Sequence, residues 1–348
     1  MTDIATSNLI LADCSPDELQ DLQSGLEDAS GCTFEIRSAQ SNRMHGSAIK
    51  KLKRYLSYFG LPLALLSRRK TIRTIIGWQQ FHAINYAFFL RLFRLKKHEN
   101  IIIANFTYKK KRGLIGAIYA RYMRYAVSDK YVDAIHVPSH GYAREVSDTF
   151  GISLDKIIVC CFGTPDRSTQ WKQLSCPYTK FAVAIGRSNR DFDFLARIWN
   201  RPEIKASGTR LIIISDTWQS TVDISDNPSI IHLSDITGDA SHPYFAKCDF
   251  AIVPLMESNI CSGDTVLLNS MMMEKPVIIT APSTLAEMYI KDGDNGLCIT
   301  KDENAAADTI LRIITDDNYR HALGQRARQS YLSSFSRHRM GINLAHAL

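Results

Sequence analysis

A polar loop followed by a short apolar run holds the residues best suited to bind a ligand. Residues 259–280 read NICSGDTVLLNSMMMEKPVIIT. The tripeptide SGD at 262–264 predicts a loop, residues 265–273 predict a helix, and the apolar run at 277–279 predicts a buried strand after a proline turn. This order is typical of parallel α/β domains, in which ligands bind at strand carboxyl ends and helix N-termini. The loop and the helix start are therefore the first candidate ligand site.

A second candidate site follows the apolar run at 181–185. Gly186 would let the backbone approach a ligand, and Arg187 and Arg190 could hold a diphosphate through paired hydrogen bonds. Asp191 could cap the helix that follows. The same residues also fit a plain strand-to-helix turn with solvated arginines, and this segment alone leaves both interpretations open.

Two shorter polar segments complete the candidates. Ser234 and Asp235 directly follow an apolar run, where exposed backbone groups could bind the edge of a nucleotide base. The segment DGDNG at 292–296 predicts a glycine-rich turn, and the turn explains it fully.

Alternating strands and helices must position these residues, and 348 residues are enough for two α/β domains. Short apolar runs predict strands at 8–12, 34–37, 74–77, 101–105, 134–137, 181–185, 211–214, 230–233, 250–253 and 277–279. Helical patterns occupy 16–28, 47–66 (disturbed at Gly60 and Pro62), 81–96, 113–127, 142–150, 192–200, 243–247, 265–273, 285–290, 305–314 and 317–335. Short strands that alternate with helices predict parallel sheets. The polar stretch 163–180, with two prolines and no apolar periodicity, predicts a linker between two such domains.

The composition indicates a folded protein with reduced thiols. Hydrophobic residues make up 45% and charged residues 22%, which excludes a disordered chain. None of the eight cysteines forms a Cys-x-x-Cys pair, so neither a disulfide framework nor a zinc site is expected. The first residues are acidic and lack a signal-peptide pattern, and no apolar stretch is long enough to span a bilayer. We therefore expect a cytoplasmic protein that is not integral to the membrane.

Basic residues are concentrated in one block of the first half. Between residues 43 and 127 the only acid is Glu99, whereas the basic residues are Arg43, Lys50, Lys51, Lys53, Arg54, Arg68, Arg69, Lys70, Arg73, Arg91, Arg94, Lys96, Lys97, Lys109, Lys110, Lys111, Arg112, Arg121 and Arg124. Large apolar and aromatic residues are interleaved with them, as in helices that lie in an anionic membrane interface. One such segment would equally suit a core-facing amphipathic helix, but three in succession favour the membrane. Nucleic acid is the other anionic partner, and the lack of a recognition motif speaks against it.

The order of these segments resembles the donor half of a GT-B glycosyltransferase and is similar to glycosyltransferase family 4. The series comprises Gly-Arg-x-x-Arg-Asp at 186–191, Leu-Ser-Asp at 233–235, Lys-Cys-Asp at 247–249, the loop and helix of 262–271, Lys-Pro at 275–276 and the turn at 292–297. The resemblance covers residues from about 135 to 348 and is specific as a series. It implies an α/β fold of two Rossmann-like domains whose parallel sheets face each other across a cleft. The expected parts are an N-terminal acceptor- and membrane-facing domain (1–163), a nucleotide-sugar-binding domain (164–336) and a helix returning to the first domain (337–348).

The resemblance also implies the roles of individual residues. Arg187 and Arg190 correspond to the basic pair that binds the diphosphate, and Asn269 to the position of a ribose-binding carboxylate. The full expected donor set is Gly186, Arg187, Arg190, Ser234, Asp235, Ser262, Gly263, Asp264, Thr265 and Asn269. The basic run expected to face the membrane is Lys109, Lys110, Lys111 and Arg112. No acidic pair stands out as a metal site, so neither a metal nor another cofactor is expected.

This chain departs from the family at positions that bear on catalysis. Where the family often has two glutamates, the chain has Cys261 and Asn269. Asparagine can still bond a hydroxyl group, but without the added strength of a charge. A glycine-rich loop after the first strand is absent, and Asn105 stands where a histidine is common.

The stereochemistry of a transfer therefore stays open at the level of sequence. A retaining transfer, which the family favours, would rely on Arg187 and Arg190 to stabilise the leaving diphosphate. An inverting transfer would need a general base near the acceptor hydroxyl, for which the candidates are Asp13, His82 and His140.

The expected function is transfer of a sugar from a nucleotide-diphosphate sugar, most commonly a uridine one, to a lipid-linked saccharide. The reaction would take place at the inner face of the plasma membrane, in the assembly of an exopolysaccharide, capsule or O-antigen, with the protein bound peripherally. One rival interpretation is a non-catalytic GT-B-like binding partner of another transferase, for which Cys261 and Asn269 speak. The other is a nucleic-acid-binding protein that uses the basic block.

Overall fold

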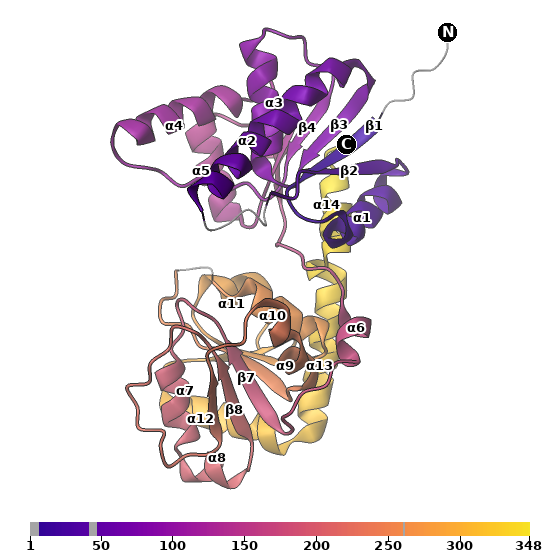
Figure 1. The fold of residues 1–348 in the computed structure, drawn as a ribbon. Coiled ribbons are helices and arrows are strands. Elements are labelled where there is room, and N and C mark those ends of the chain that lie inside the picture. The colour runs from indigo at the N-terminus through magenta and orange to yellow at the C-terminus, as the bar shows by residue number, and fades with distance from the viewer. Residues whose placement is uncertain (1–6, 42–46, 260–261) are drawn as a thin grey trace. The chain divides into compact units, whose positions relative to one another are not determined.

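The computed structural model describes residues 7–41, 47–259 and 262–348 and contains two parallel α/β units (Figure 1). The first unit comprises Met1–Pro165 and Arg337–Leu348, and the second comprises Asp166–Ser336. The chain passes from one unit to the next two residues later than the expected boundary at residue 163. The last helix belongs to the first unit.

The first unit is built on a six-stranded sheet in the order β2-β1-β3-β4-β5-β6. Every neighbouring pair is parallel, as the alternation of strands and helices predicts. The strands are β1 (Ser7–Ala12), β2 (Phe34–Ser38), β3 (Ile72–Gly77), β4 (Asn100–Ile103), β5 (Ala134–Val137) and β6 (Ile157–Val159). The edge strand β6 was not expected from the sequence, because three apolar residues are too short a run to show a period.

Different helices cover the two faces of this sheet. They are α1 (Gln20–Ser30), α2 (Ala48–Leu65), α3 (Gln80–Leu92), α4 (Gly113–Ala126), α5 (His140–Phe150) and α14 (Arg337–Ala345). Ile10 packs on the face of α1 and α14, whereas Leu9 and Leu11 pack on the face of α2, α3, α4 and α5. A methyl group on Gly25 of α1 would overlap the backbone of His338, so glycine permits the close contact that joins α14 to this unit.

Helix α2 runs without a break through Pro62, although the sequence predicted a disturbance there. Proline lacks the N–H that would bond the carbonyl of Tyr58, four residues earlier. The side chain of Asn85 on α3 donates to that carbonyl at 2.8 Å instead. The freed acceptor is therefore satisfied by a tertiary contact that the sequence of α2 could not reveal.

The second unit repeats the architecture with the strand order β12-β11-β10-β7-β8-β9, again parallel throughout. Its strands are β7 (Phe181–Ile185), β8 (Arg210–Ile214), β9 (Ile230–Leu233), β10 (Phe250–Val253), β11 (Val277–Thr280) and β12 (Leu297–Ile299). The five predicted strands are confirmed, and β12 is an additional short edge strand. Because all strands are parallel, their carboxyl ends and the loops that follow meet along one edge.

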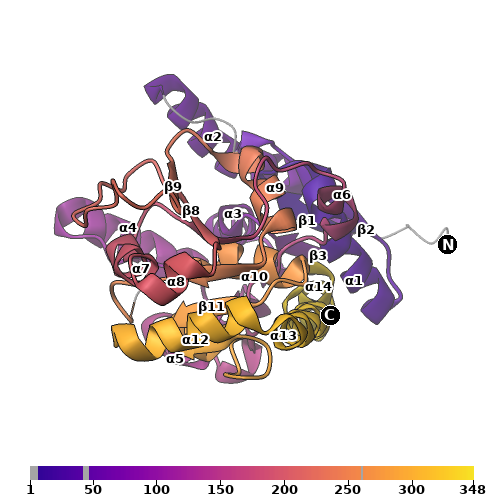
Figure 2. The same ribbon diagram turned by 90° about the horizontal axis from the view of Figure 1, so that it is seen from below.

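The helices of the second unit are α6 (Ser168–Lys172), α7 (Phe192–Trp199), α8 (Pro202–Ala206), α9 (His242–Lys247), α10 (Asp264–Met272), α11 (Thr284–Tyr289), α12 (Glu303–Thr315) and α13 (Asp317–Ser330). Helices α7, α8 and α12 pack on one face of the sheet and α9 on the other. Figure 2 shows α12 and α13, in yellow, along one side of this unit. The stretch 163–180 is not only a linker, because α6 lies within it and buries Trp171 against His242 at the start of α9.

Candidate functional site

Two glycines and one arginine bring the two sequence candidates together at the carboxyl edge of the second sheet. Gly186 follows β7 with φ of 155°, and Gly263 precedes α10 with φ of 117°. The guanidinium group of Arg190 lies between them. A Cβ atom on Gly186 would come within 2.6 Å of the Arg190 Nε, and one on Gly263 would overlap its Nη2. Both positions therefore need glycine for backbone conformation and for space.

Arg190 binds backbone carbonyls of both loops. Its Nε donates to Ile185 at 3.1 Å, and its Nη1 donates to Ser188 at 3.1 Å and to Ser262 at 3.1 Å. The side chain is buried, and burial lowers its pKa to about 10, while nearby Asp264 acts in the opposite direction. Nε and Nη1 thus connect the two loops, while Nη2 lies on the side of Gly263. The expected role of Arg190 in binding the diphosphate stays a prediction.

Neighbouring residues of the same loop reinforce this connection. The amide of Asn189 exchanges two hydrogen bonds with the backbone of Glu257, at 3.0 Å and 2.7 Å. Asp191 accepts from the backbone N–H of Phe194 at 3.1 Å, which confirms it as the cap of α7, and it also pairs with Lys301. The loop after β7 is thus held by the loop after β10 and by Lys301, which follows β12.

A cavity of about 280 Å³ opens beside this loop at the ends of β7 and β8. It is lined by Ile185, Gly186, Arg187, Ile214, Ser215, Asp216, Ile236, Thr237, Gly238 and Ser241. The exposed Arg187 pairs with Asp216 at 2.8 Å. An anion that enters the cavity would compete with Asp216 for the arginine, and the half-buried Ile236 offers apolar contact area for a flat ring.

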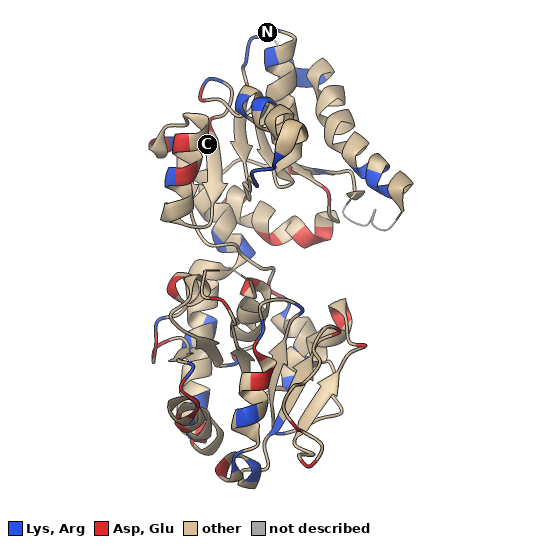
Figure 3. Cartoon of the chain, turned by 90° about the vertical axis from the view of Figure 1, so that its left-hand side faces the viewer, with Lys and Arg blue, Asp and Glu red and all other residues tan. Residues whose placement is uncertain are grey.

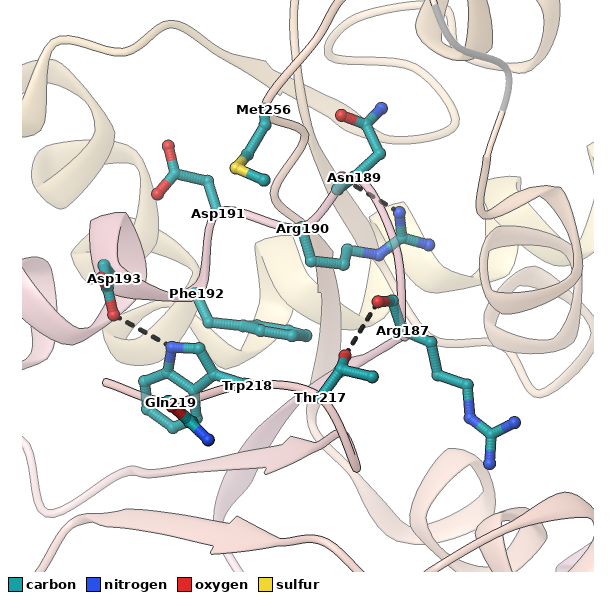
Figure 4. A pocket seen from close by; sticks show the side chains of 10 residues that line it. All are labelled: Arg187, Asn189, Arg190, Asp191, Phe192, Asp193, Thr217, Trp218, Gln219 and Met256. Atoms are coloured by element: carbon teal, nitrogen blue, oxygen red, sulfur yellow. Dashed lines mark hydrogen bonds between the residues drawn. The ribbon is translucent and has the colours of Figure 1, made fainter. Parts of the chain in front are cut away.

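A second, more open cavity of about 380 Å³ lies on the other side of the same loop (Figure 4). Trp218 and Phe192 form its floor, with ring centroids 5.7 Å apart, and Trp218 Nε1 donates to Asp193 at 2.9 Å. Burial tends to raise the pKa of Asp193, but hydrogen bonds from Thr221 and Trp218 outweigh it and lower the pKa. Arg187 and Arg190 also line this cavity, together with Asn189, Asp191, Asp193, Thr217, Gln219 and Met256.

The remaining residues of the expected donor set differ in their burial and in whether they line the smaller cavity. Asp264 begins α10 and is half-buried, and its carboxylate accepts from the Thr265 N–H at 2.8 Å. Asn269 lies further along α10 and is half-buried. Ser234 and Asp235 are exposed and do not line the smaller cavity. Ile236, Thr237 and Gly238, the next residues of that loop, line it instead, and the only signal in the sequence was the glycine after a strand.

Cys261, one of the two departures from the family pattern, lies outside the described residues, as does Arg43 of the basic block. The other cysteines are free thiols, of which Cys14 and Cys248 are buried.

In the first unit the structure brings two of the three base candidates together. Asp13 follows β1, and its carboxylate accepts from the Gln79 Nε2 at 2.9 Å. Gln79 Nε2 also lies 3.5 Å from the Tyr58 hydroxyl, and His82 packs edge-on against the Tyr58 ring. His82 is fully buried, so it cannot touch an acceptor in this conformation. His140 is exposed at the start of α5 and follows β5, which β4 separates from β3.

Two buried histidines make the stability of the first unit dependent on pH. Burial lowers the pKa of both His82 and His136 to about 4, although Asp13 acts to raise that of His82. His136 accepts from the Asn105 N–H through Nδ1 and contacts the Cys160 carbonyl through Nε2, which fits a neutral ring. Between pH 6.5 and 4 the unfolded chain therefore binds protons that the folded chain does not.

We expect the free energy of unfolding to be fully present above pH 6.5 and to decrease as the pH falls towards 4. A fall in pKa from 6.5 to about 4 corresponds to about 3 kcal/mol for each histidine. Urea unfolding followed across this range measures the loss. The variant His82→Phe should show a shallower pH dependence than the wild type, and the exposed control His140→Gln should not. Equal slopes for all three proteins would contradict this assignment.

The basic run Lys109–Arg112 lies in the segment between β4 and α4, and all four side chains are exposed. Among the described residues, no group of three or more histidine, cysteine or acidic side chains is arranged to hold a metal ion. Within the same residues, no helix is both long and apolar enough to cross a bilayer.

Comparison with known protein families shows what the second unit resembles. Residues 179–316, which contain most of the second unit, match the family model described as Glycosyl transferases group 1. No curated protein matches the sequence significantly.

Similar folds occur among solved structures at low sequence identity. HepE from Anabaena in complex with UDP has a TM-score of 0.58 at 12% identity, with 97% of each chain covered. WaaG, described as a glycosyltransferase involved in lipopolysaccharide biosynthesis, has a TM-score of 0.54 at 12% identity and covers 94% of this chain and 95% of its own. The N-terminal domain of trehalose-6-phosphate phosphatase from Candida albicans has a TM-score of 0.60 at 11% identity and covers 100% and 97%.

Two parallel Rossmann-like units and the family match together define the protein as a glycosyltransferase with the GT-B fold. Residues 179–316 of its second unit are similar to the group 1 glycosyl transferases, and the loops of Arg187, Arg190 and Gly263 lie at the carboxyl edge of that unit's sheet.

Proposed function

We propose that the protein transfers a sugar from a uridine-diphosphate sugar to a lipid-linked saccharide during surface polysaccharide assembly. The observation that carries the donor assignment is the cavity at the ends of β7 and β8, with Arg187 at its side and the Gly263 loop of α10 joined to it through Arg190. A cationic side chain and a helix N-terminus are the groups that bind a diphosphate. The similarity to HepE, solved in complex with UDP-glucose, supports uridine as the base.

The acceptor assignment rests on the first unit. The exposed run Lys109–Arg112 is followed on α4 by the exposed apolar residues Leu114 and Ile115. Basic and apolar groups side by side favour an anionic membrane surface, where lipid-linked saccharides are found. The protein would thus act at the cytoplasmic face of the plasma membrane, without a metal ion and without nucleic acid as a partner.

Donor binding is tested by thermal unfolding with nucleoside diphosphates and their sugars. A donor at about 100 times its dissociation constant should stabilise the folded protein by about 2.7 kcal/mol. UDP and a UDP-sugar should raise the melting temperature, with no change on adding EDTA. Release of UDP from the UDP-sugar should be slow alone and faster with a lipid-linked acceptor. The proposal fails if no nucleotide sugar is bound or turned over.

A second candidate function is a non-catalytic partner of another transferase. Asn269 favours it, since an amide replaces a carboxylate on the helix that follows the donor loop. Donor binding without turnover by the isolated chain, together with turnover on addition of a partner transferase, would select this alternative.

A further inference from the structure

Helix α2 carries a continuous stripe of exposed apolar side chains. Among the described residues, most exposed large apolar side chains lie on α2, at the end of α3 and at the start of α4. Besides Tyr55, those on α2 are Ile49, Leu52, Leu56, Phe59 and Leu63, with exposed fractions between 42% and 68%. We call these five residues the α2 stripe. Their spacing of three, four, three and four residues places them on one face of the helix.

The opposite face of α2 already has a partner. Tyr58, Pro62 and Leu65 are buried, and α2 packs on α3, as Figure 1 shows. The α2 stripe is therefore a second apolar face that the fold leaves in solvent. It extends beyond α2, because Phe59 contacts Phe89 with ring centroids 6.3 Å apart, and Phe89 stacks on the exposed Phe93. An apolar surface of this extent is typical of a binding face.

The charges around the α2 stripe favour an anionic partner. Four cations, Lys50, Lys51, Lys53 and Arg54, lie in its first two turns, and Arg68, Arg69 and Lys70 follow its end. No acid lies on α2, and Figure 3 shows blue and no red along this helix, which begins at the grey trace. Glu99, the only acid of the block, is buried and accepts from the Tyr86 hydroxyl at 2.6 Å.

A second copy of the chain does not fit these charges. Stripe-to-stripe pairing of two α2 helices would bring cations together in either orientation, since both ends of the helix are basic and neither copy supplies a carboxylate. An anionic bilayer satisfies both features, because its headgroups bind the cations and its acyl region takes up the apolar side chains. With four cations α2 is too polar to span a bilayer, so it would lie in the plane of the interface.

We infer that α2 is an insertion helix, which enters the interface of an anionic bilayer along the α2 stripe. This inference deepens the proposed membrane function and rests on it for its biological setting. It assigns apolar insertion to α2, an element separate from the basic run 109–112.

Vesicle binding of the full chain tests the inference. The probes are vesicles of phosphatidylcholine alone and of phosphatidylcholine mixed with phosphatidylglycerol. The double variant Leu52→Gln with Leu56→Gln should bind the mixed vesicles about tenfold more weakly than the wild type, since two inserted side chains are lost. The control Leu154→Gln, which replaces an exposed leucine outside the α2 stripe, should bind as the wild type does.

A fluorescence measurement tests insertion directly. In the variant Phe59→Trp, the emission of the added tryptophan should shift to the blue with the mixed vesicles only.

Each outcome supports or contradicts the insertion of α2 into the bilayer. Equal vesicle binding by the double variant and the wild type, or no blue shift, would overturn the inference, as would a wild-type dimer in solution that the double variant dissociates. UDP binding by the double variant serves as the folding check and should be unchanged. If the wild type binds UDP but not the vesicles, only the insertion fails; if it binds vesicles but no nucleotide sugar, only the proposed transferase activity fails.

Discussion

Replacing Arg190 with alanine should lower turnover of the donor by at least about 100-fold. The variant loses the hydrogen bonds to the carbonyls of Ile185, Ser188 and Ser262, which join the loop after β7 to the loop before α10. Misplacing a binding group by about 1 Å can cost 100-fold in rate. Because charged hydrogen bonds contribute about 1.5–3 kcal/mol each and some carbonyls stay buried, the second unit should also lose about 3 kcal/mol of stability.

Measurements of both stability and turnover separate Arg190 from a residue that only contacts the donor. Urea unfolding and initial rates with the UDP-sugar are compared for Arg190→Ala and Arg190→Lys, with exposed Arg210→Lys as the matched control. Lysine cannot reach three carbonyls at once, so it should not restore either quantity. A stable Arg190→Ala protein with unchanged turnover would show that the loops hold their positions without the arginine.

Gly263→Ala is expected to have the second largest effect. Its φ of 117° is strained for any side chain, and its Cβ would overlap the Arg190 Nη2. Left-handed backbone costs about 1–2 kcal/mol and overpacking about 1–3 kcal/mol, so the variant should lose about 2–5 kcal/mol. Gly141→Ala is the control, since Gly141 lies in α5 with open space around it. Unfolding curves measure the loss of stability, and donor-binding experiments measure the effect on donor affinity.

A double-mutant cycle divides the cost of the added methyl group into its two parts. In an Arg190→Ala background the overlap disappears while the strained backbone remains. Gly263→Ala should therefore cost about 1–3 kcal/mol less there than in the wild type. If the two substitutions prove additive, steric contact with Arg190 is not the reason for glycine at this position.

Local patterns were sufficient to predict most of the fold. Strands such as 134–137, 181–185 and 250–253 were predicted with the bounds that the structure has, because buried parallel strands are uninterrupted apolar runs between polar turns. The short edge strands β6 and β12 escaped, since three residues carry no period. The helix α6 within the supposed linker escaped for the same reason, and its position depends on the contact between Trp171 and His242.

The candidate donor site could be predicted only in part from the sequence. The order of Gly186, Arg187 and Gly263 along the chain was visible, and parallel topology places their loops on one edge of the sheet. The direction of the Arg190 side chain was not visible, because one of its acceptors is the Ser262 carbonyl, 72 residues away in sequence. The burial of His82 and the pairing of Arg187 with Asp216 were hidden likewise.

The sequence by itself determined the location of the basic block and, through the resemblance of its ordered motifs to a known family, the class of the protein and the candidate donor loops. These follow from residue types, spacing and order, which need no knowledge of distant contacts. Only the tertiary structure decided that Arg190 connects two loops, that His82 is enclosed and that one face of α2 remains in solvent. Burial and side-chain direction are set by which elements pack together, and that packing brings together residues far apart in the chain.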